Sequence, residues 1–136
     1  MLLGFQQRFE KKILAKEKRH TIRDKRKKPF KPGDRLDCYV NPRQKSMRLM
    51  GRWPCTRVQD IRITRRKGKA QLAEIFIDSQ WLTFDEREAL ARADGFPNFA
   101  TMMQFWTSRL PFHGDMIHWN PDQPQPGPKK KGRKRK

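Results

Sequence analysis

The stretch QRFEKKILAKEKRHTIRD, residues 7–24, divides into a short amphipathic helix and a strand, and the rest of the chain is interpreted around it. Phe5, Phe9 and Ile13 recur at positions i, i+4 and i+8, so they share one side of a helix while the basic residues between them face water. An apolar stripe of this kind anchors a helix on a sheet. We therefore expect a helix that begins near Phe5, although residues 1–5 are equally compatible with a first strand.

A strand follows over residues 20–23. Its period of two sends Thr21 and Arg23 to one face and His20 to the other. Lys18 lies just before the strand, so we expect Lys18, Thr21 and Arg23 to share one pocket. His20 is a further candidate, because an imidazole beside this pocket can stack on a base.

These residues resemble the ASCH family, a PUA-like fold associated with RNA, whose signature runs from a helix through G-x-K-T-x-T-x-R to a Gly-Asp turn and a strand. Lys18, Thr21, Ile22, Arg23 and the turn at 33–34 fall in register with that signature. The lead-in is similar to that of the small N4-acetylcytidine amidohydrolases. The chain departs from the family pattern at Lys16, Glu17, Arg19 and His20.

The resemblance implies an α+β fold, a small PUA-like curled β-barrel with flanking helices. It also implies, for the amidohydrolases, Lys18 as proton acceptor, Thr21 as nucleophile and Asp94 as the acid, with Glu88 in reserve. Such a lysine needs burial or nearby cations to lower its pKa. In the alternative that we favour, Lys18 and Arg23 bind phosphate and Thr21 forms a hydrogen bond in the pocket. Asp94 is then a solvated residue at a helix end.

Length and charge indicate one domain, residues 1–119, with a disordered tail that is rich in proline and basic residues, 120–136. Lys and Arg outnumber Asp and Glu by 33 to 14, which leaves a net charge of +19 and indicates a polyanionic partner. The tail holds seven basic side chains and one acidic one, so most of the charge belongs to the domain. Without an apolar run or a leader, we expect a soluble monomer with no membrane partner. It should be cytoplasmic if the host is a bacterium or phage, and nuclear if the host is a eukaryote, where the basic tail would resemble a nuclear localisation signal.

Turn signals divide the chain after residue 24 into short strands, as in a small curled sheet or barrel. The expected features are a turn at 32–34, a strand over 36–40, strand structure around 47–55 interrupted at Gly51 and Pro54, a strand from Val58 to a hairpin tip at 65–69, a strand over 71–78, and a last strand, 116–119, after a turn at 114–115.

Two helices are expected between residues 83 and 106. Thr83 and Glu86 match a capping box at the start of the first, and Gly95 is placed to end it. We expect Ala89, Leu90 and Ala93 to form its inner stripe. The second helix carries Phe99, Met102, Met103, Phe105 and Trp106 and should be largely buried.

Cysteine and histidine spacing indicates no metal site and no cofactor. Cys38 and Cys55 lack a C-x-x-C spacing and sit on expected strands, so buried, reduced thiols are favoured over a disulfide. His113 and His118 are five residues apart across the expected turn, which is not a metal-ligand pattern.

The basic loops 25–31 and 65–69 are expected to hold backbone phosphates, and an Arg-Trp pair extends the expected binding surface. Trp53, beside Arg52, is the tryptophan we expect to be exposed, either as a base-stacking platform or on a solvated strand. The candidate ligand-binding residues are Lys18, His20, Thr21, Arg23, Lys25, Arg26, Lys27, Lys28, Arg52, Trp53, Arg65, Arg66 and Lys67.

The function predicted from the sequence is binding of RNA, or of a nucleotide or nucleoside, in a basic pocket. The main alternative is an enzyme, either an amidohydrolase on N4-acetylcytidine-like nucleosides or a ribonuclease. A third possibility is a nonspecific DNA-binding accessory protein of phage type, in which the basic tail at 129–136 does most of the binding.

Overall fold

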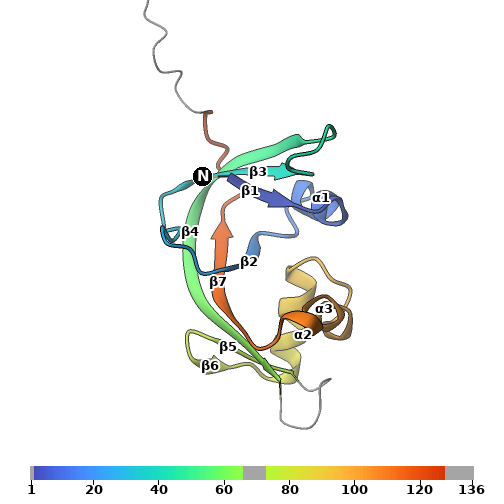
Figure 1. The fold of residues 1–136 in the computed structure, drawn as a ribbon. Coiled ribbons are helices and arrows are strands. Elements are labelled where there is room, and N and C mark those ends of the chain that lie inside the picture. The colour runs from blue at the N-terminus through green and yellow to red at the C-terminus, as the bar shows by residue number, and fades with distance from the viewer. Residues whose placement is uncertain (1, 66–72, 128–136) are drawn as a thin grey trace, which may run out of the picture.

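One long strand, β4, runs through the whole sheet and joins its two halves (Figure 1). The computed structural model describes residues 2–65 and 73–127. Its elements are β1 (Leu2–Phe5), the 3-10 helix η1 (Gln7–Phe9), α1 (Glu10–Leu14), β2 (His20–Asp24), β3 (Arg35–Val40), β4 (Arg48–Arg65), β5 (Ala73–Ile77), β6 (Gln80–Trp81), α2 (Phe84–Ala93), α3 (Phe99–Trp106), the 3-10 helix η2 (Thr107–Arg109) and β7 (Phe112–Trp119).

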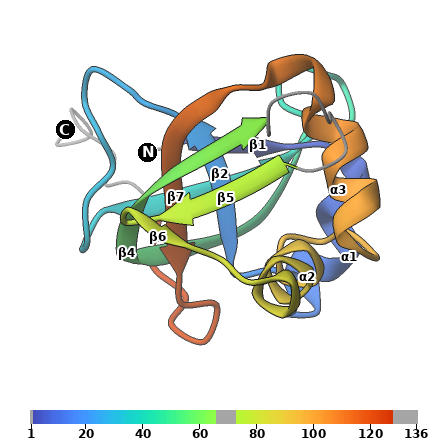
Figure 2. The ribbon, with the colours of Figure 1, turned by 90° about the horizontal axis from the view of Figure 1, so that it is seen from below.

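The sheet is mixed, which makes this a small α+β domain. β1 pairs in parallel with β3, and β3 pairs antiparallel with the first half of β4. The second half of β4 lies between β5 and β7, while β2 pairs with β7 and β6 with β5, all antiparallel. Figure 2 shows α1, α2 and α3 together on one side of the strands. The α+β class is confirmed, but no backbone pairing joins β1 to β2 in the described chain, and the strands do not close into a barrel.

Of the two alternatives for the N-terminal segment, the structure has the first strand, and Phe5 does not belong to the helix that follows. Phe5 belongs to β1, whose backbone pairs with β3, and the helix begins only after it, as η1 followed by α1. Phe9 and Ile13 are buried as predicted. Pairing to a strand more than thirty residues away satisfies the backbone of β1, so the helical spacing of Phe5 is overridden by tertiary structure.

β4 passes through both residues that were expected to interrupt it. The loop before β3 continues the hydrogen bonding beside Pro54, since Cys55 N donates to Asp34 O at 2.7 Å. A side chain on Gly51 would collide with the indole of Trp53, so the glycine gives this ring its room. Trp53 is only 7% exposed and stacks on Trp119 with ring centroids 6.2 Å apart. The prediction of an exposed Trp53 is therefore wrong.

The two helices begin and end where the sequence indicates. Thr83 and Glu86 form the capping box of α2, and Gly95 ends it with a φ of 102°. Its inner face was partly mispredicted: Leu90 and Ala91 are buried, whereas Ala89 and Ala93 are exposed. α3 is largely buried, as expected, through Phe99, Met102, Met103 and Trp106.

The C-terminal strand is longer than expected and the chain stays ordered beyond it. β7 runs straight through residues 114–115, where a turn was predicted. Pro121 is buried, and Gln125 N donates to Arg52 O at 2.8 Å, so residues 120–127 lie against the domain instead of in a disordered tail. Residues 128–136 and the hairpin tip after Arg65 lie outside the described residues.

Cys38 and Cys55 are buried, unpaired thiols on β3 and β4, as predicted. Burial raises the pKa of Cys38 to about 12. None of the helices in residues 2–65 and 73–127 has the length and apolar character that a membrane crossing requires.

Candidate functional site

A pocket of about 200 Å³ lies beside the unpaired edges of β1 and β2 and the end of α2. Pockets for drug-sized ligands usually measure roughly 300–1,000 Å³, so this cavity suits a smaller group such as a single base. Aromatic and charged side chains from distant parts of the chain line it. The aromatic ones are Phe5, Phe9, Phe96, Phe105 and Trp106, and the charged ones are Lys18, Arg23, Asp94 and Arg109.

A buried ion pair joins the segment just before β2 to the end of α2. Lys18 Nζ lies 2.6 Å from Asp94 Oδ1 and donates to the Asp94 backbone carbonyl at 2.7 Å. Lys18 is 2% exposed and Asp94 5%. Asp94 is the C-cap of α2, where the helix dipole also favours a cation. The expectation of a solvated Asp94 is therefore wrong, and Lys18 and Asp94 meet as the resemblance implied.

Burial and pairing act on this pair in opposite directions. Burial favours a neutral Asp94, but the charge of Lys18 and the nearby His20 outweigh it and lower the Asp94 pKa. Burial also lowers the Lys18 pKa, against the opposing effect of Asp94. We take the ionised pair as the form at neutral pH, because the ammonium has two oxygen acceptors within 2.7 Å.

Arg23 forms a bridge across the open edge between β2 and β1. Its Nη2 donates to Gly4 O at 2.6 Å, its Nε donates to Thr21 Oγ1 at 3.1 Å, and its guanidinium lies 4.8 Å from the centre of the Phe5 ring. Lys18, Thr21 and Arg23 therefore line one pocket, as the strand periodicity predicted. Because Thr21 Oγ1 accepts from Arg23, its own proton remains free to donate.

His20 does not line this pocket. It is 5% exposed, and its Nε2 lies 3.2 Å from Asp94 Oδ1. A base-stacking role is therefore wrong for His20, because a buried ring offers no open face. Arg19 is exposed and turned toward Asp122, 3.9 Å away, so it does not fill the pocket either.

Glu88, the reserve acid, belongs to another part of the structure. Both of its carboxylate oxygens accept from Phe99 N, at 3.1 and 3.0 Å, which satisfies an amide at the start of α3. Asp94 is thus the carboxylate that faces the pocket.

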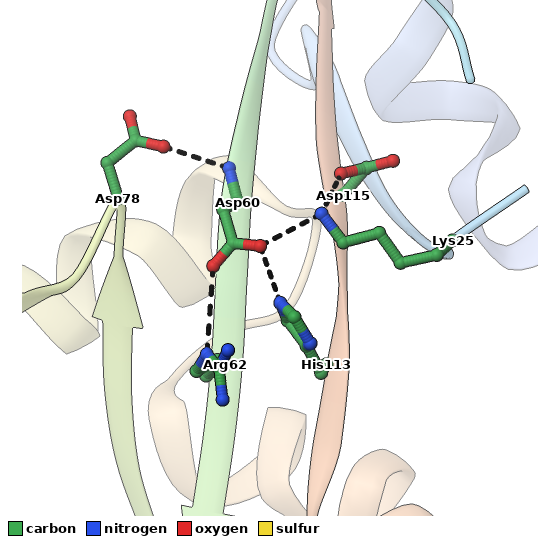
Figure 3. Close-up of polar contacts among 6 residues, drawn as sticks. All are labelled: Lys25, Asp60, Arg62, Asp78, His113 and Asp115. Atoms are coloured by element: carbon green, nitrogen blue, oxygen red, sulfur yellow. Dashed lines mark hydrogen bonds and ion pairs between the residues drawn. The ribbon is translucent and has the colours of Figure 1, made fainter.

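Lys25 is held within the protein, in the cluster that Figure 3 shows. Its Nζ lies 2.7 Å from Asp115 Oδ1 and 2.8 Å from Asp60 Oδ1, and His113 contacts the same Asp60 oxygen. Hydrogen bonds to Asp115 and Asp60 raise the Lys25 pKa, and the bond from Lys25 is the main cause of the lowered Asp60 pKa. Lys25 was expected to contact phosphate, but it is already paired with two carboxylates.

The other predicted ligand-binding residues are divided between open surface and internal contacts. Lys27 and Lys28 are exposed, and Arg26 lies over the Phe30 ring at 4.6 Å. Arg52 Nε lies 3.3 Å from Asp37 Oδ1, and Arg65 Nη2 donates to Thr107 O at 2.8 Å. The remaining two, Arg66 and Lys67, lie outside the described residues.

Sequence reasoning missed the aromatic walls and Arg109. Phe96 directly follows the Asp94-Gly95 helix end, and this position next to a candidate pocket residue could have indicated that Phe96 lines the pocket too. Arg109, on η2, lies 4.9 Å from the Phe105 ring centre, and only the chain path brings it to β1. In residues 2–65 and 73–127, no three His, Cys, Asp or Glu side chains are placed to hold a metal ion.

Comparison of the chain with protein-family models, with curated proteins and with solved structures finds no match.

Proposed function

We propose that this is an RNA- or nucleotide-binding protein of the ASCH, PUA-like type, which takes one nucleotide of a single strand into the pocket beside β1 and β2. The observation that carries the proposal is the pocket's composition. Aromatic faces supply stacking that tolerates any base, and the charged groups Lys18, Asp94 and Arg109 supply donors and acceptors for a base edge or phosphate. The resemblance of residues 18–34 to the ASCH signature adds support.

Charge supports a polyanionic ligand for the same site. The pocket itself holds three cations, Lys18, Arg23 and Arg109, against one carboxylate, Asp94. The chain around it carries a net charge of +19. Phosphates on either side of an inserted nucleotide would meet this excess of positive charge, and the affinity should fall steeply with salt.

The test is binding of fluorescein-labelled single-stranded RNA octamers, one for each base, measured by fluorescence anisotropy. Arg109→Gln removes a pocket charge, and Arg92→Gln is its matched control, because it removes one charge from an exposed site on α2. We expect Arg109→Gln to weaken binding about tenfold more than Arg92→Gln, as for a side chain that contacts the ligand directly.

Equal, small losses in the two variants would refute pocket binding. If deletion of residues 128–136 then removed most of the affinity, and DNA bound as well as RNA, the nonspecific accessory protein would be the better description.

The amidohydrolase is the second candidate, favoured by the meeting of Lys18, Thr21 and Asp94 in one pocket. Lys18 would accept the threonine proton, and burial, which lowers its pKa, acts in the required direction. The lowered pKa of Asp94 acts against this chemistry, because a general acid must hold a proton. For this reason we place binding first.

The hydrolysis test is incubation with N4-acetylcytidine and chromatography of the products, with Thr21→Ala and Lys18→Ala beside the unaltered protein. Cytidine released by the unaltered protein and by neither variant would establish the reaction. No turnover by a folded protein would exclude this substrate, and gel analysis of the octamers from the binding assay tests for a ribonuclease.

A further inference from the structure

Asp94 has two nitrogen partners beside the same carboxylate oxygen. Lys18 Nζ lies 2.6 Å from Asp94 Oδ1, and His20 Nε2 lies 3.2 Å from it. The closer ammonium holds the oxygen. His20 Nε2 is buried and is not aligned with a hydrogen-bond acceptor in the described chain. Buried polar atoms without partners are uncommon, so the imidazole is placed for a bond that it does not fully make in this state.

Only one of the two partners is needed to balance the carboxylate. All three side chains are almost completely withdrawn from water, so when Lys18 and His20 are both charged, Asp94 balances only one of them. The other then needs an acceptor of its own, from a ligand or from water in the pocket that Lys18 lines. If Lys18 moves to a ligand, Asp94 loses its counter-ion, and a protonated His20 can replace it. Lys18 and a protonated His20 are therefore alternative partners for Asp94.

A further titratable group beside His20 is His118, its register partner on β7, with ring centroids 5.5 Å apart. Burial lowers the pKa of His118 to about 4, aided by the charges of His20 and Arg57 and opposed by Asp78. Its Nε2 is also bonded to Gln59 Oε1 at 2.8 Å. His118 therefore stays neutral near neutral pH and does not oppose a charge on His20.

We propose that His20 is a positioning residue for the pocket: when protonated, it takes over Asp94 and releases the Lys18 ammonium to an oxygen of the bound ligand. Ligand binding at Lys18 is then accompanied by uptake of one proton at His20. This inference rests on the proposed function, and it adds that the ligand presents a hydrogen-bond acceptor, a carbonyl or phosphate oxygen, at the pocket end marked by Lys18.

The first test uses the free protein and needs no ligand. The side-chain NMR signals of Lys18 and His20 are followed from about pH 5 to about pH 8, the range in which imidazoles change charge. We expect the Lys18 signal to shift with the same midpoint as the His20 ring, and this shift to be absent in His20→Gln. A Lys18 signal that ignores the titration of His20 would overturn the inference.

The second test is the pH dependence of binding for the tightest of the four RNA octamers. Uptake of one proton strengthens binding by up to about tenfold for each pH unit lowered. His20→Gln should lose this dependence. His113→Gln, which removes an exposed imidazole on β7, should keep it. A purely structural role for His20 would lower affinity equally at every pH and leave the slope unchanged, which would count against the inference.

The two proposals fail in distinguishable ways. If Arg109→Gln and Arg92→Gln bind the octamers equally, the proposed function fails, and the NMR titration of the free protein still decides whether His20 controls the Lys18–Asp94 pair.

Discussion

The buried pair of Lys18 and Asp94 should show strong energetic coupling. The perturbation is a double-mutant cycle with Lys18→Met and Asp94→Asn. Methionine keeps most of the aliphatic stem of Lys18, whose ammonium lies 5.0 Å from the centre of the Phe9 ring, so the change mainly removes the charge. Asparagine keeps the shape of Asp94 in the same way.

The magnitude follows from burial. The side chains of Lys18 and Asp94 are only 3% and 8% exposed, and removing one partner from a buried pair costs about 3–5 kcal/mol when no other charge takes its place. The cycle is therefore measured at about pH 8, above the range in which imidazoles ordinarily carry a charge, so that His20 does not replace Lys18 beside Asp94. The double variant leaves neither charge. We therefore expect it to be at least about 2 kcal/mol more stable than the sum of the two single losses.

The assay is urea denaturation followed by tryptophan fluorescence, with the free energy of unfolding taken by linear extrapolation. Additivity within about 0.5 kcal/mol would refute the reasoning, because it would mean that the two charges do not interact.

The same pair predicts a pH dependence. The folded-state pKa of Asp94 lies below its ordinary value of 3.8, so the folded state holds the proton less tightly than the unfolded chain. The stabilisation from Asp94 is complete above pH 3.8 and is lost as the pH falls through the folded-state pKa. The stability difference between the unaltered protein and Asp94→Asn should therefore shrink in acid.

Three further predictions use the same denaturation assay. Trp53→Ala should lower the free energy of unfolding by about 3–5 kcal/mol, because it empties a buried site, while Trp81→Ala, at a position 49% exposed, should change it by less than about 1 kcal/mol. Similar losses in the two variants would contradict the burial of Trp53. Gly95→Ala should cost about 2 kcal/mol or more, because the residue has a φ of 102° and the added methyl group would lie only 2.9 Å from the Phe9 ring. Gly33→Ala, with a similar φ of 96° but open space around it, should cost only about 1 kcal/mol, and the reverse order would count against the Phe9 contact. The pKa of His118 is about 4 in the folded protein and 6.5 in the unfolded chain, so the folded state binds fewer protons and stability should rise between about pH 4 and pH 6.5. The rise should be on the order of 2 kcal/mol after allowance for partial exposure, and a His118→Gln variant with the same pH profile would refute this.

Features set by a few neighbouring residues were predictable. The capping box at Thr83 and the positive φ of Gly95 follow from local backbone chemistry, and the structure has both. The alternation from Leu36 to Val40 correctly indicated a half-buried strand. Gly51 was harder to interpret, because glycine occurs both where a strand is interrupted and where another group packs closely against the backbone. Residue type alone did not show that Gly51 makes room for the Trp53 ring within a continuous strand.

The candidate site was predictable only in part, because part of its chemistry is local. Lys18, Thr21 and Arg23 lie within six residues of chain, so strand periodicity was sufficient to bring them together. The exposed role expected for Trp53 failed, since an aromatic residue on a strand is buried or exposed according to what covers it. Lys25 failed for a similar reason: its carboxylate partners come from β4 and β7.

The net charge of +19, the turn at residues 32–34, the ends of α2 and the pocket residues on β2 all follow from the amino-acid sequence. The groups that meet those residues depend on how the distant segments pack. Asp94 reaches Lys18 across 76 positions of the chain, and pairing with β3 makes residues 2–5 a strand where the sequence allowed either a strand or a helix. The physical reason is that burial and pairing depend on groups brought together by folding, whereas caps and turns depend on the backbone of their immediate neighbours.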